Sequence, residues 1–184
     1  MFSSEDIKKA IEEGNLVVEP LIEEAIRPAG LRLHLGPQLL KPLPGKVVDV
    51  KNGVIPDYEE IVITEDKPYQ LDPGEFILGA TYEKISVGAN IGFLIEGRST
   101  LARIGLTVVQ TAMLVYPGHR GRGVTLELAN HGPNAILLYP KMKIARVALI
   151  ELNTPTEDLY DDEGKYREQS TVGKPIFKNE IVDL

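Results

Sequence analysis

The chain contains neither cysteine nor tryptophan, and only three of its 184 residues are histidines. The lack of cysteine excludes disulfides, thiol nucleophiles and cysteine-ligated zinc. His34, His119 and His131 are widely spaced and form no His-x-x-His or His-x-Glu motif, so we expect no zinc site. No apolar run approaches the length of a membrane-spanning helix, and no signal peptide is evident at the start. We therefore expect a cytoplasmic protein.

The charge balance is the next constraint. The formal net charge is −7, and the sequence has no long basic run, which argues against nucleic-acid and membrane partners. An acidic protein that binds a polyanion must gather its basic residues locally. Hydrophobic residues make up 43% and charged residues 26%, an ordinary globular mixture. The length predicts a single domain over residues 1–184.

Short apolar segments separated by proline and glycine dominate the pattern. A helix is expected first, because Ser3 or Ser4 can cap it and Gly14 can end it. Many short strands after one amino-terminal helix predict a mainly β fold, either a sandwich or a barrel. In the alternating segment 31–35 the leucines share one face, so His34 is expected on the solvated face. Strands are expected at residues 16–19, 31–35, 47–50, 60–64, 76–81, 85–87, 91–96, 106–111, 124–129, 135–139 and 144–152.

The stretch from 97 to 132 gathers most of the features that suggest chemistry. Ser99 is a good N-cap residue, the next residues favour a helix, and Gly105 is placed to end it. Arg98 and Arg103 flank this short helix. Guanidinium groups beside open backbone N–H groups favour a phosphate. The stretch therefore predicts a phosphate-binding segment.

Glu127 is the unusual residue of the strand expected at 124–129. Alternation places it on one face with Thr125 and Ala129, while Val124, Leu126 and Leu128 share the other. A carboxylate within an apolar strand is costly to desolvate unless it has a partner. Glu127 is therefore either a residue of a solvated outer face or a general base beside the phosphate-binding segment.

Five motifs together resemble the dCTP deaminase family, a branch of the trimeric dUTPase superfamily, and an archaeal-type member in particular. They are GRSTLAR at 97–103, QTA at 110–112, the Pro-Gly turn at 117–118, TLEL at 125–128 and KYREQS at 165–170. The resemblance covers most of the chain. It implies a distorted jelly roll or dUTPase-like β-barrel that assembles as a homotrimer. It also implies that the polar tail 154–184 closes over a bound nucleotide.

The resemblance implies hydrolytic deamination of dCTP to dUTP and ammonia, feeding dUMP and dTTP synthesis. Glu127 would activate water without a metal at the base, and Mg²⁺ would bind through the triphosphate rather than through protein ligands. Zinc-dependent deaminases use ligands that this chain lacks. The expected partners are dCTP and other deoxynucleoside triphosphates. Substrate-binding residues would be Arg98, Ser99, Thr100, Arg103, Thr111, Ala112, Thr125, Tyr160, Lys165 and Gln169.

The chain departs from the family pattern at two informative positions. Arg32 stands where the family usually has an aspartate, and Tyr116 replaces the aspartate that can hold the sugar 3′-hydroxyl. There are two alternatives. One is a dUTP pyrophosphatase, or a bifunctional enzyme that performs both steps; Glu127 argues against a pure pyrophosphatase, and Tyr116 weakens this alternative. The other is a non-catalytic nucleotide-binding paralogue, which these departures motivate.

Overall fold

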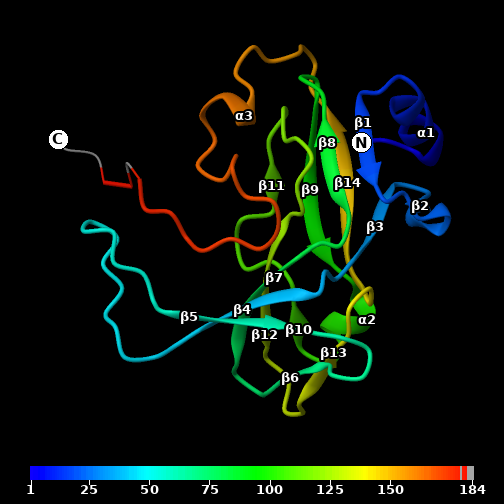
Figure 1. Cartoon of the computed structure of the whole chain (residues 1–184). Coiled ribbons are helices and arrows are strands. Elements are labelled where there is room, and N and C mark those ends of the chain that lie inside the picture. Colours follow the sequence, from blue (N-terminus) through cyan, green and yellow to red (C-terminus); the bar gives the residue numbers. More distant parts are fainter. Residues whose placement is uncertain (179, 182–184) are drawn as a thin grey trace.

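The computed structural model describes residues 1–178, 180 and 181. The chain forms many short strands and one longer helix near the amino terminus (Figure 1). The helical segments are α1 (Ser4–Glu12), η1 (Glu23–Ala25), α2 (Ser99–Ala102) and α3 (Tyr160–Glu163). The strands are β1 (Leu16–Glu19), β2 (Ile26–Arg27), β3 (Gly30–His34), β4 (Gln38–Pro42), β5 (Tyr58–Val62), β6 (Tyr69–Leu71), β7 (Phe76–Ala80), β8 (Lys84–Val87), β9 (Ile91–Gly97), β10 (Leu106–Thr107), β11 (Leu114–Val115), β12 (Thr125–Asn130), β13 (Ile136–Leu138) and β14 (Lys143–Glu151).

Two five-stranded sheets form the body. Their strand orders are β10-β12-β7-β4-β5 and β11-β9-β14-β3-β2, and two smaller sheets pair β1 with β8 and β13 with β6. Figure 1 shows β9 and β14 running upright while β4 and β5 cross the molecule. The two large sheets stay separate, so the mainly β, jelly-roll-like prediction is confirmed, without closure into one barrel.

Helix α1 begins as the sequence predicts. The Ser3 hydroxyl accepts a hydrogen bond from the Asp6 N–H at 3.2 Å, and the Asp6 carboxylate accepts one from the Ser3 N–H at 2.8 Å. This reciprocal capping box satisfies two backbone donors that the first turn would otherwise leave open. Ile7 and Ala10 are buried against the body, so the helix covers one end of the core.

Alternating side chains along the central strands build the core. Leu126 and Leu128 of β12 are fully buried, as are Phe93 of β9 and Leu149 of β14. Burial of each such side chain contributes about 1.5–3 kcal/mol relative to exposure. The opposite side chains of the same strands therefore lie on the outer faces of the sheets, where the functional residues are found.

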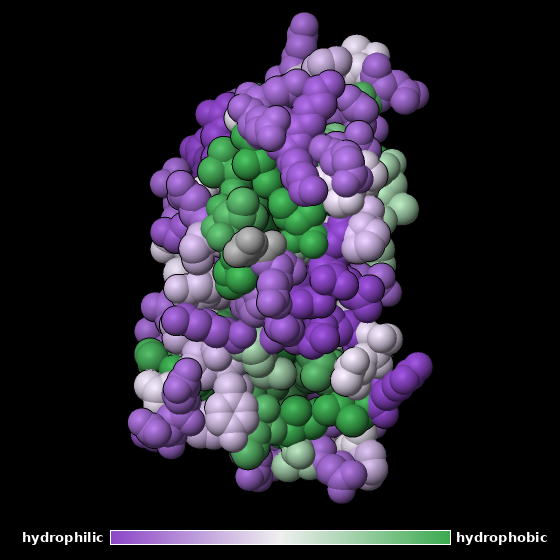
Figure 2. Space-filling view, turned by 90° about the vertical axis from the view of Figure 1, so that its right-hand side faces the viewer, coloured by the Kyte–Doolittle hydropathy of each residue, from purple (hydrophilic) through white to green (hydrophobic). Residues whose placement is uncertain are grey.

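The outer face of β9, β14 and β3 carries two rows of aligned side chains. In the apolar row, Leu114 pairs with Leu94, which pairs with Ala148. In the charged row, Glu96 pairs with Arg146, which pairs with Arg32. Directly paired residues of antiparallel strands share a face. Figure 2 shows the right-hand side of the molecule, where hydrophilic residues form a band between two hydrophobic areas.

The structure corrects three predictions about single elements. The strand expected at 106–111 is confined to Leu106–Thr107. Residues 47–50 form no strand; Asp49 makes only an isolated bridge to Val54. Helix α2 has Arg98 rather than Ser99 at its N-cap, and no side chain caps it.

The expected solvent exposure of His34 is also wrong. The side chain is buried and its Nδ1 pairs with the buried carboxylate of Glu83, which also accepts the His34 backbone N–H at 2.9 Å. A carboxylate from the next segment therefore covers the polar end of β3.

No helix within the described residues is long and apolar enough to cross a bilayer.

Candidate functional site

Glu127 lies on β12 with a fixed carboxylate. Its Oε2 accepts the backbone N–H of Gln110 at 2.9 Å, and its own N–H donates to the Val108 carbonyl at 3.1 Å. The Gln110 side chain donates to the Thr107 hydroxyl at 3.1 Å, which steadies the loop that holds the carboxylate. The Glu127 side chain is half-buried, so it is oriented by the protein and still reachable.

The carboxy-terminal tail crosses this same face of β12. Gln169 donates from Nε2 to the Thr125 hydroxyl at 2.7 Å and also to the Thr171 carbonyl. Thr125 precedes Glu127 by two residues, so their side chains share a face of the strand. The structure therefore brings Gln169, Thr125 and Glu127, three of the predicted site residues, to one face of one strand.

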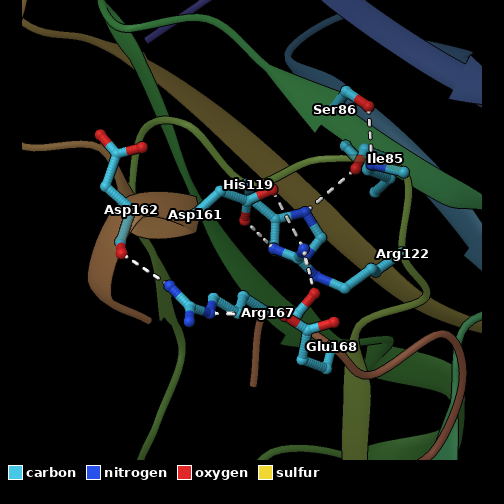
Figure 3. A network of polar contacts seen from close by, with 9 residues as sticks. Ile85, Ser86, His119, Arg122, Asp161, Asp162, Arg167 and Glu168 are labelled. Carbon is cyan, nitrogen blue, oxygen red and sulfur yellow. Dashed lines mark hydrogen bonds and ion pairs between the residues drawn. The ribbon is translucent and has the colours of Figure 1, made fainter. Parts of the chain in front are cut away.

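A polar network fixes the tail to the body (Figure 3). Arg122 makes a two-pronged ion pair with Asp161, with one contact of 3.1 Å, and donates to the Arg167 carbonyl at 2.9 Å. Its guanidinium carbon lies 5.6 Å from the centre of the Tyr160 ring. Both members of the ion pair are largely shielded from solvent, and a bidentate, partly desolvated pair is strongly orienting. We call these residues, together with His119, the tail clasp.

Gly118 makes the approach of the tail possible. Its φ of +79° is in the region that favours glycine, and a Cβ there would meet the Leu159 Cβ at 2.7 Å. Close to this point, Tyr160 donates its backbone N–H to the Pro117 carbonyl at 2.9 Å. The tail thus first packs against the body at the predicted Pro-Gly turn.

His119 packs between Phe93 of β9 and Tyr160 of α3. Its ring lies edge-on to Phe93, with centroids 6.0 Å apart, and tilted to Tyr160 at 6.1 Å. Its Nδ1 is 3.0 Å from the Ile85 carbonyl oxygen, which requires a proton on Nδ1. Burial lowers the pKa of His119, and the hydrogen bond to Ile85 offsets part of that effect. The histidine is therefore held neutral within the clasp.

The lowered pKa of His119 predicts acid sensitivity. In the unfolded chain a histidine takes up its proton near pH 6.5, whereas buried His119 resists protonation until lower pH. Stability should therefore fall as pH decreases below about 6.5, by up to about 1.4 kcal/mol for each unit of lowered pKa. Urea unfolding between pH 8 and pH 5 measures this, and His119→Gln should flatten the slope. Equal slopes for the variant and the wild type would contradict the assignment.

A second set of predicted residues lines a basic pocket of about 400 Å³ on the other large sheet. Arg98, Ser99 and Thr100 share it with Arg32 and Arg146. Arg98 is held in place by a 2.8 Å bond from its Nη1 to the Lys143 carbonyl. Burial, followed by the neighbouring charges of Arg32 and Arg146, lowers the pKa of Arg98. This pocket is the local gathering of positive charge that an acidic polyanion-binding protein requires.

Other predicted residues lie elsewhere within the single chain. Thr111 and Ala112 are exposed on the loop before β11, and Arg103 is exposed at the end of α2. The Lys165 ammonium pairs with Glu180, and Tyr160 packs in the tail clasp. The structure thus divides the predicted site between the face of β12, with the adjoining loop of Thr111 and Ala112, and the basic pocket.

Three residues of the site did not follow from the sequence patterns. Gln110 heads the QTA motif, but its role depends on a backbone N–H that meets a residue 17 positions away. His119 and Arg122 lie in the glycine-rich turn GHRGRG, and an arginine between two glycines was the available signal for Arg122. Their partners Tyr160 and Asp161 are about forty residues further along the chain.

Comparison with known proteins gives a consistent result. The model of the dCTP deaminase-like family matches residues 1–152. A Methanopyrus kandleri protein named dCTP deaminase, dUMP-forming, is 39% identical over 174 residues, with 90% of each chain covered. A Haloarcula marismortui protein named dCTP deaminase is 37% identical over 178 residues, covering 92% of this chain and 91% of its own.

The fold comparison agrees. The crystal structure of 2′-deoxycytidine 5′-triphosphate deaminase from Agrobacterium tumefaciens superposes with a TM-score of 0.62 at 17% identity. The match covers 83% of this chain and 47% of the Agrobacterium chain, so this chain spans about half of that protein. From the family match over most of its length and from these relatives, the chain belongs to the dCTP deaminase-like family.

Proposed function

We propose that this chain is an enzyme that deaminates dCTP hydrolytically to dUTP and ammonia. The observation that carries the proposal is the half-buried Glu127 carboxylate, anchored by the Gln110 N–H on the strand face that the tail reaches through Gln169. The names of the Methanopyrus and Haloarcula relatives support the same reaction.

The chemistry follows from what one carboxylate can do. Water must add to C4 of the cytosine ring, and a base must accept its proton. Glu127 accepts that proton and passes it to N3 as the C4–OH bond forms. It then takes the proton of the new C4 hydroxyl and gives it to the C4 amino group, so that the C–N bond breaks, the C4 carbonyl of uracil forms and ammonia leaves. Gln110 N–H fixes one carboxylate oxygen, and in the part of the chain described here no other hydrogen bond reaches the carboxylate oxygens. The remaining oxygen is thus available to the water.

The triphosphate requires positive charge and hydroxyl donors. Arg98, Ser99, Thr100 and Arg103 supply these groups, and Lys165 supplies another once it leaves Glu180. The proposed contacts to the base and the sugar come from Thr111, Ala112, Thr125, Tyr160 and Gln169. In this proposal the chain is a single domain, and its tail 154–184 covers the bound nucleotide. Mg²⁺ binds through phosphate oxygens, the ligands it prefers. A cytoplasmic location stays a prediction.

Replacing Arg103 by alanine should weaken the binding of dCTP much more than the binding of deoxycytidine. The exposed guanidinium makes a charge-assisted bond only when phosphate is present, so its loss should cost roughly 1.5–3 kcal/mol of dCTP affinity. Calorimetric titration of both ligands measures the difference, with the exposed Lys8→Ala as the control for a general change of charge. Equal weakening of both ligands would remove the phosphate role.

We also propose that the enzyme is a homotrimer whose sites are completed between copies. The apolar row of Leu114, Leu94 and Ala148 faces outward, and the neighbouring Met113 is 45% exposed. A second copy would cover this surface. Light scattering should give about three times 20.3 kDa. A fully active monomer at micromolar concentration would contradict the assembly.

A second candidate is a bifunctional enzyme that also cleaves dUTP to dUMP. The names of the Methanopyrus kandleri and Methanosphaera stadtmanae relatives, dCTP deaminase, dUMP-forming, favour it. One experiment separates the candidates: incubation with dCTP and magnesium, followed by chromatographic separation of the nucleotides. Product dUTP alone supports the deaminase and dUMP the bifunctional enzyme. Binding without turnover would instead indicate a non-catalytic paralogue.

A further inference from the structure

Three arginines from three separate segments, Arg32, Arg98 and Arg146, converge on the basic pocket, and Arg27 of β2 lines it as a fourth. Arg32 lies on β3, Arg146 on β14, and Arg98 precedes α2. Arg32 and Arg146 are direct register partners, so their side chains share the outer face of the sheet. All three line the same pocket with the hydroxyls of Ser99 and Thr100. The strand register and the start of α2 therefore bring these side chains together, with Arg32 and Arg98 half-buried and Arg146, Ser99 and Thr100 exposed.

The three charges lack a local counter-charge. Among the described residues no ion pair joins Arg32, Arg98 or Arg146 to a carboxylate. Glu96 faces Arg146 across the register without forming an ion pair with it. Neighbouring like charges repel one another, and the repulsion grows where solvent is partly excluded. The chain has a net charge of −7, yet no carboxylate of the described residues forms an ion pair with this cluster.

The backbone holds the wall of the pocket close to β14. Gly30, with φ of +137°, lies so near the Val147 carbonyl that a Cβ would approach its oxygen to 2.2 Å. This contact seats the β2–β3 hairpin against β14 and places Arg32 beside Arg146. The volume of about 400 Å³ accommodates a small ligand.

We propose that Arg32 and Arg146 extend the phosphate site of Arg98, Ser99 and Thr100, so that this pocket takes the polyphosphate chain of the nucleotide. That the bound polyphosphate belongs to a nucleotide rests on the proposed function. That the pocket binds a polyphosphate anion does not. Planar guanidinium groups bind phosphate oxygens in pairs, so a longer phosphate chain gains contacts that a monophosphate cannot make. Arg32 and Arg146 thereby become residues that select triphosphates over monophosphates.

Inorganic tripolyphosphate tests the anion site without any nucleotide chemistry. Calorimetric titration at constant ionic strength should show binding to the wild type that is roughly ten- to hundredfold weaker in Arg146→Gln and in Arg32→Gln. Arg120→Gln, an exposed arginine outside the pocket, should bind like the wild type. Removing one of the repelling charges should also leave the free variants at least as stable as the wild type, which excludes misfolding as the cause.

A competition experiment then assigns the anion to the nucleotide. Saturating tripolyphosphate should weaken dCTP binding and leave deoxycytidine binding unchanged. Absence of tripolyphosphate binding to the wild type, or equal binding by all variants, would overturn the pocket. Tripolyphosphate binding without competition against dCTP would overturn its assignment to the triphosphate. A failure of the deaminase proposal would instead appear as tripolyphosphate binding without turnover of dCTP.

Discussion

Glu127→Gln should reduce deamination of dCTP by roughly 10²-fold or more while leaving dCTP binding intact, as expected for the loss of a general base. The amide has the shape of the carboxylate, and its oxygen can still accept the Gln110 N–H. What it cannot do is accept the proton of the attacking water. The effect should therefore be on kcat, with little change in the affinity for dCTP in the presence of magnesium.

A matched control is available on α1. Glu12 is exposed at the end of α1, and Figure 1 shows α1 and β12 in different parts of the molecule. Glu12→Gln therefore makes the same change of charge without touching the site. Near-normal turnover by Glu127→Gln would return Glu127 to the role of a solvated outer-face residue. In that case the preference for a deaminase over a binding paralogue would lose its main structural support.

Local sequence signals predicted local structure well. The serine cap of α1, the alternation of Leu126 and Leu128, and the Pro-Gly turn at 117–118 each depend on residues close in the chain. Even the face of β12 that carries Glu127 followed from alternation alone. These features are encoded by backbone sterics and by a period of two residues, which a single sequence displays directly.

Features that depend on partners far along the chain could not be predicted in this way. His34 does lie opposite the buried leucines of β3, but Glu83, 49 residues away, covers it. The valines at 47, 48 and 50 look like a strand, yet only an isolated bridge forms there. The pairing of Arg32 with Arg146 depends on which strands become neighbours. Strand order is a property of the whole fold, so a repulsive cluster of arginines is invisible until the sheets are assembled.

The tail is the other long-range feature, and it lies beyond the part of the chain that the family model matches. The family model ends at residue 152, whereas Tyr160, Asp161, Arg167 and Gln169 all lie beyond it. The body reaches these residues through Arg122, whose backbone carbonyl accepts the Ile85 N–H at 3.0 Å. The clasp is therefore rooted in the body and depends on a side chain to hold the tail.

Asp161→Ala should release the tail from β12 and lower the kcat/KM for dCTP by about tenfold or more. Removing one partner of a buried ion pair costs about 3–5 kcal/mol when the other charge stays buried. Because the tail lies at the surface, its detachment lets Arg122 regain water, so the expected response is local release rather than global unfolding. Release would also separate Gln169 from Thr125. Bound nucleotide favours closure again, which limits the kinetic loss.

Trypsin digestion provides a readout of release that is independent of catalysis, since Lys165 and Arg167 lie within the tail. Cleavage there should be much faster in Asp161→Ala than in the wild type, and Arg122→Gln should behave in the same way. Asp162→Ala is the matched control, because the Asp162 carboxylate projects away from the clasp (Figure 3). The substitution keeps the backbone, whose carbonyl accepts from Arg167 at 2.8 Å and whose N–H donates to the Leu159 carbonyl at 3.0 Å. The double variant of Arg122 and Asp161 should be cleaved little faster, and should lose little more activity, than either single variant, as expected for residues that act as a pair. Cleavage at the wild-type rate in Asp161→Ala would show that the ion pair does not hold the tail, and any loss of activity would then need another cause.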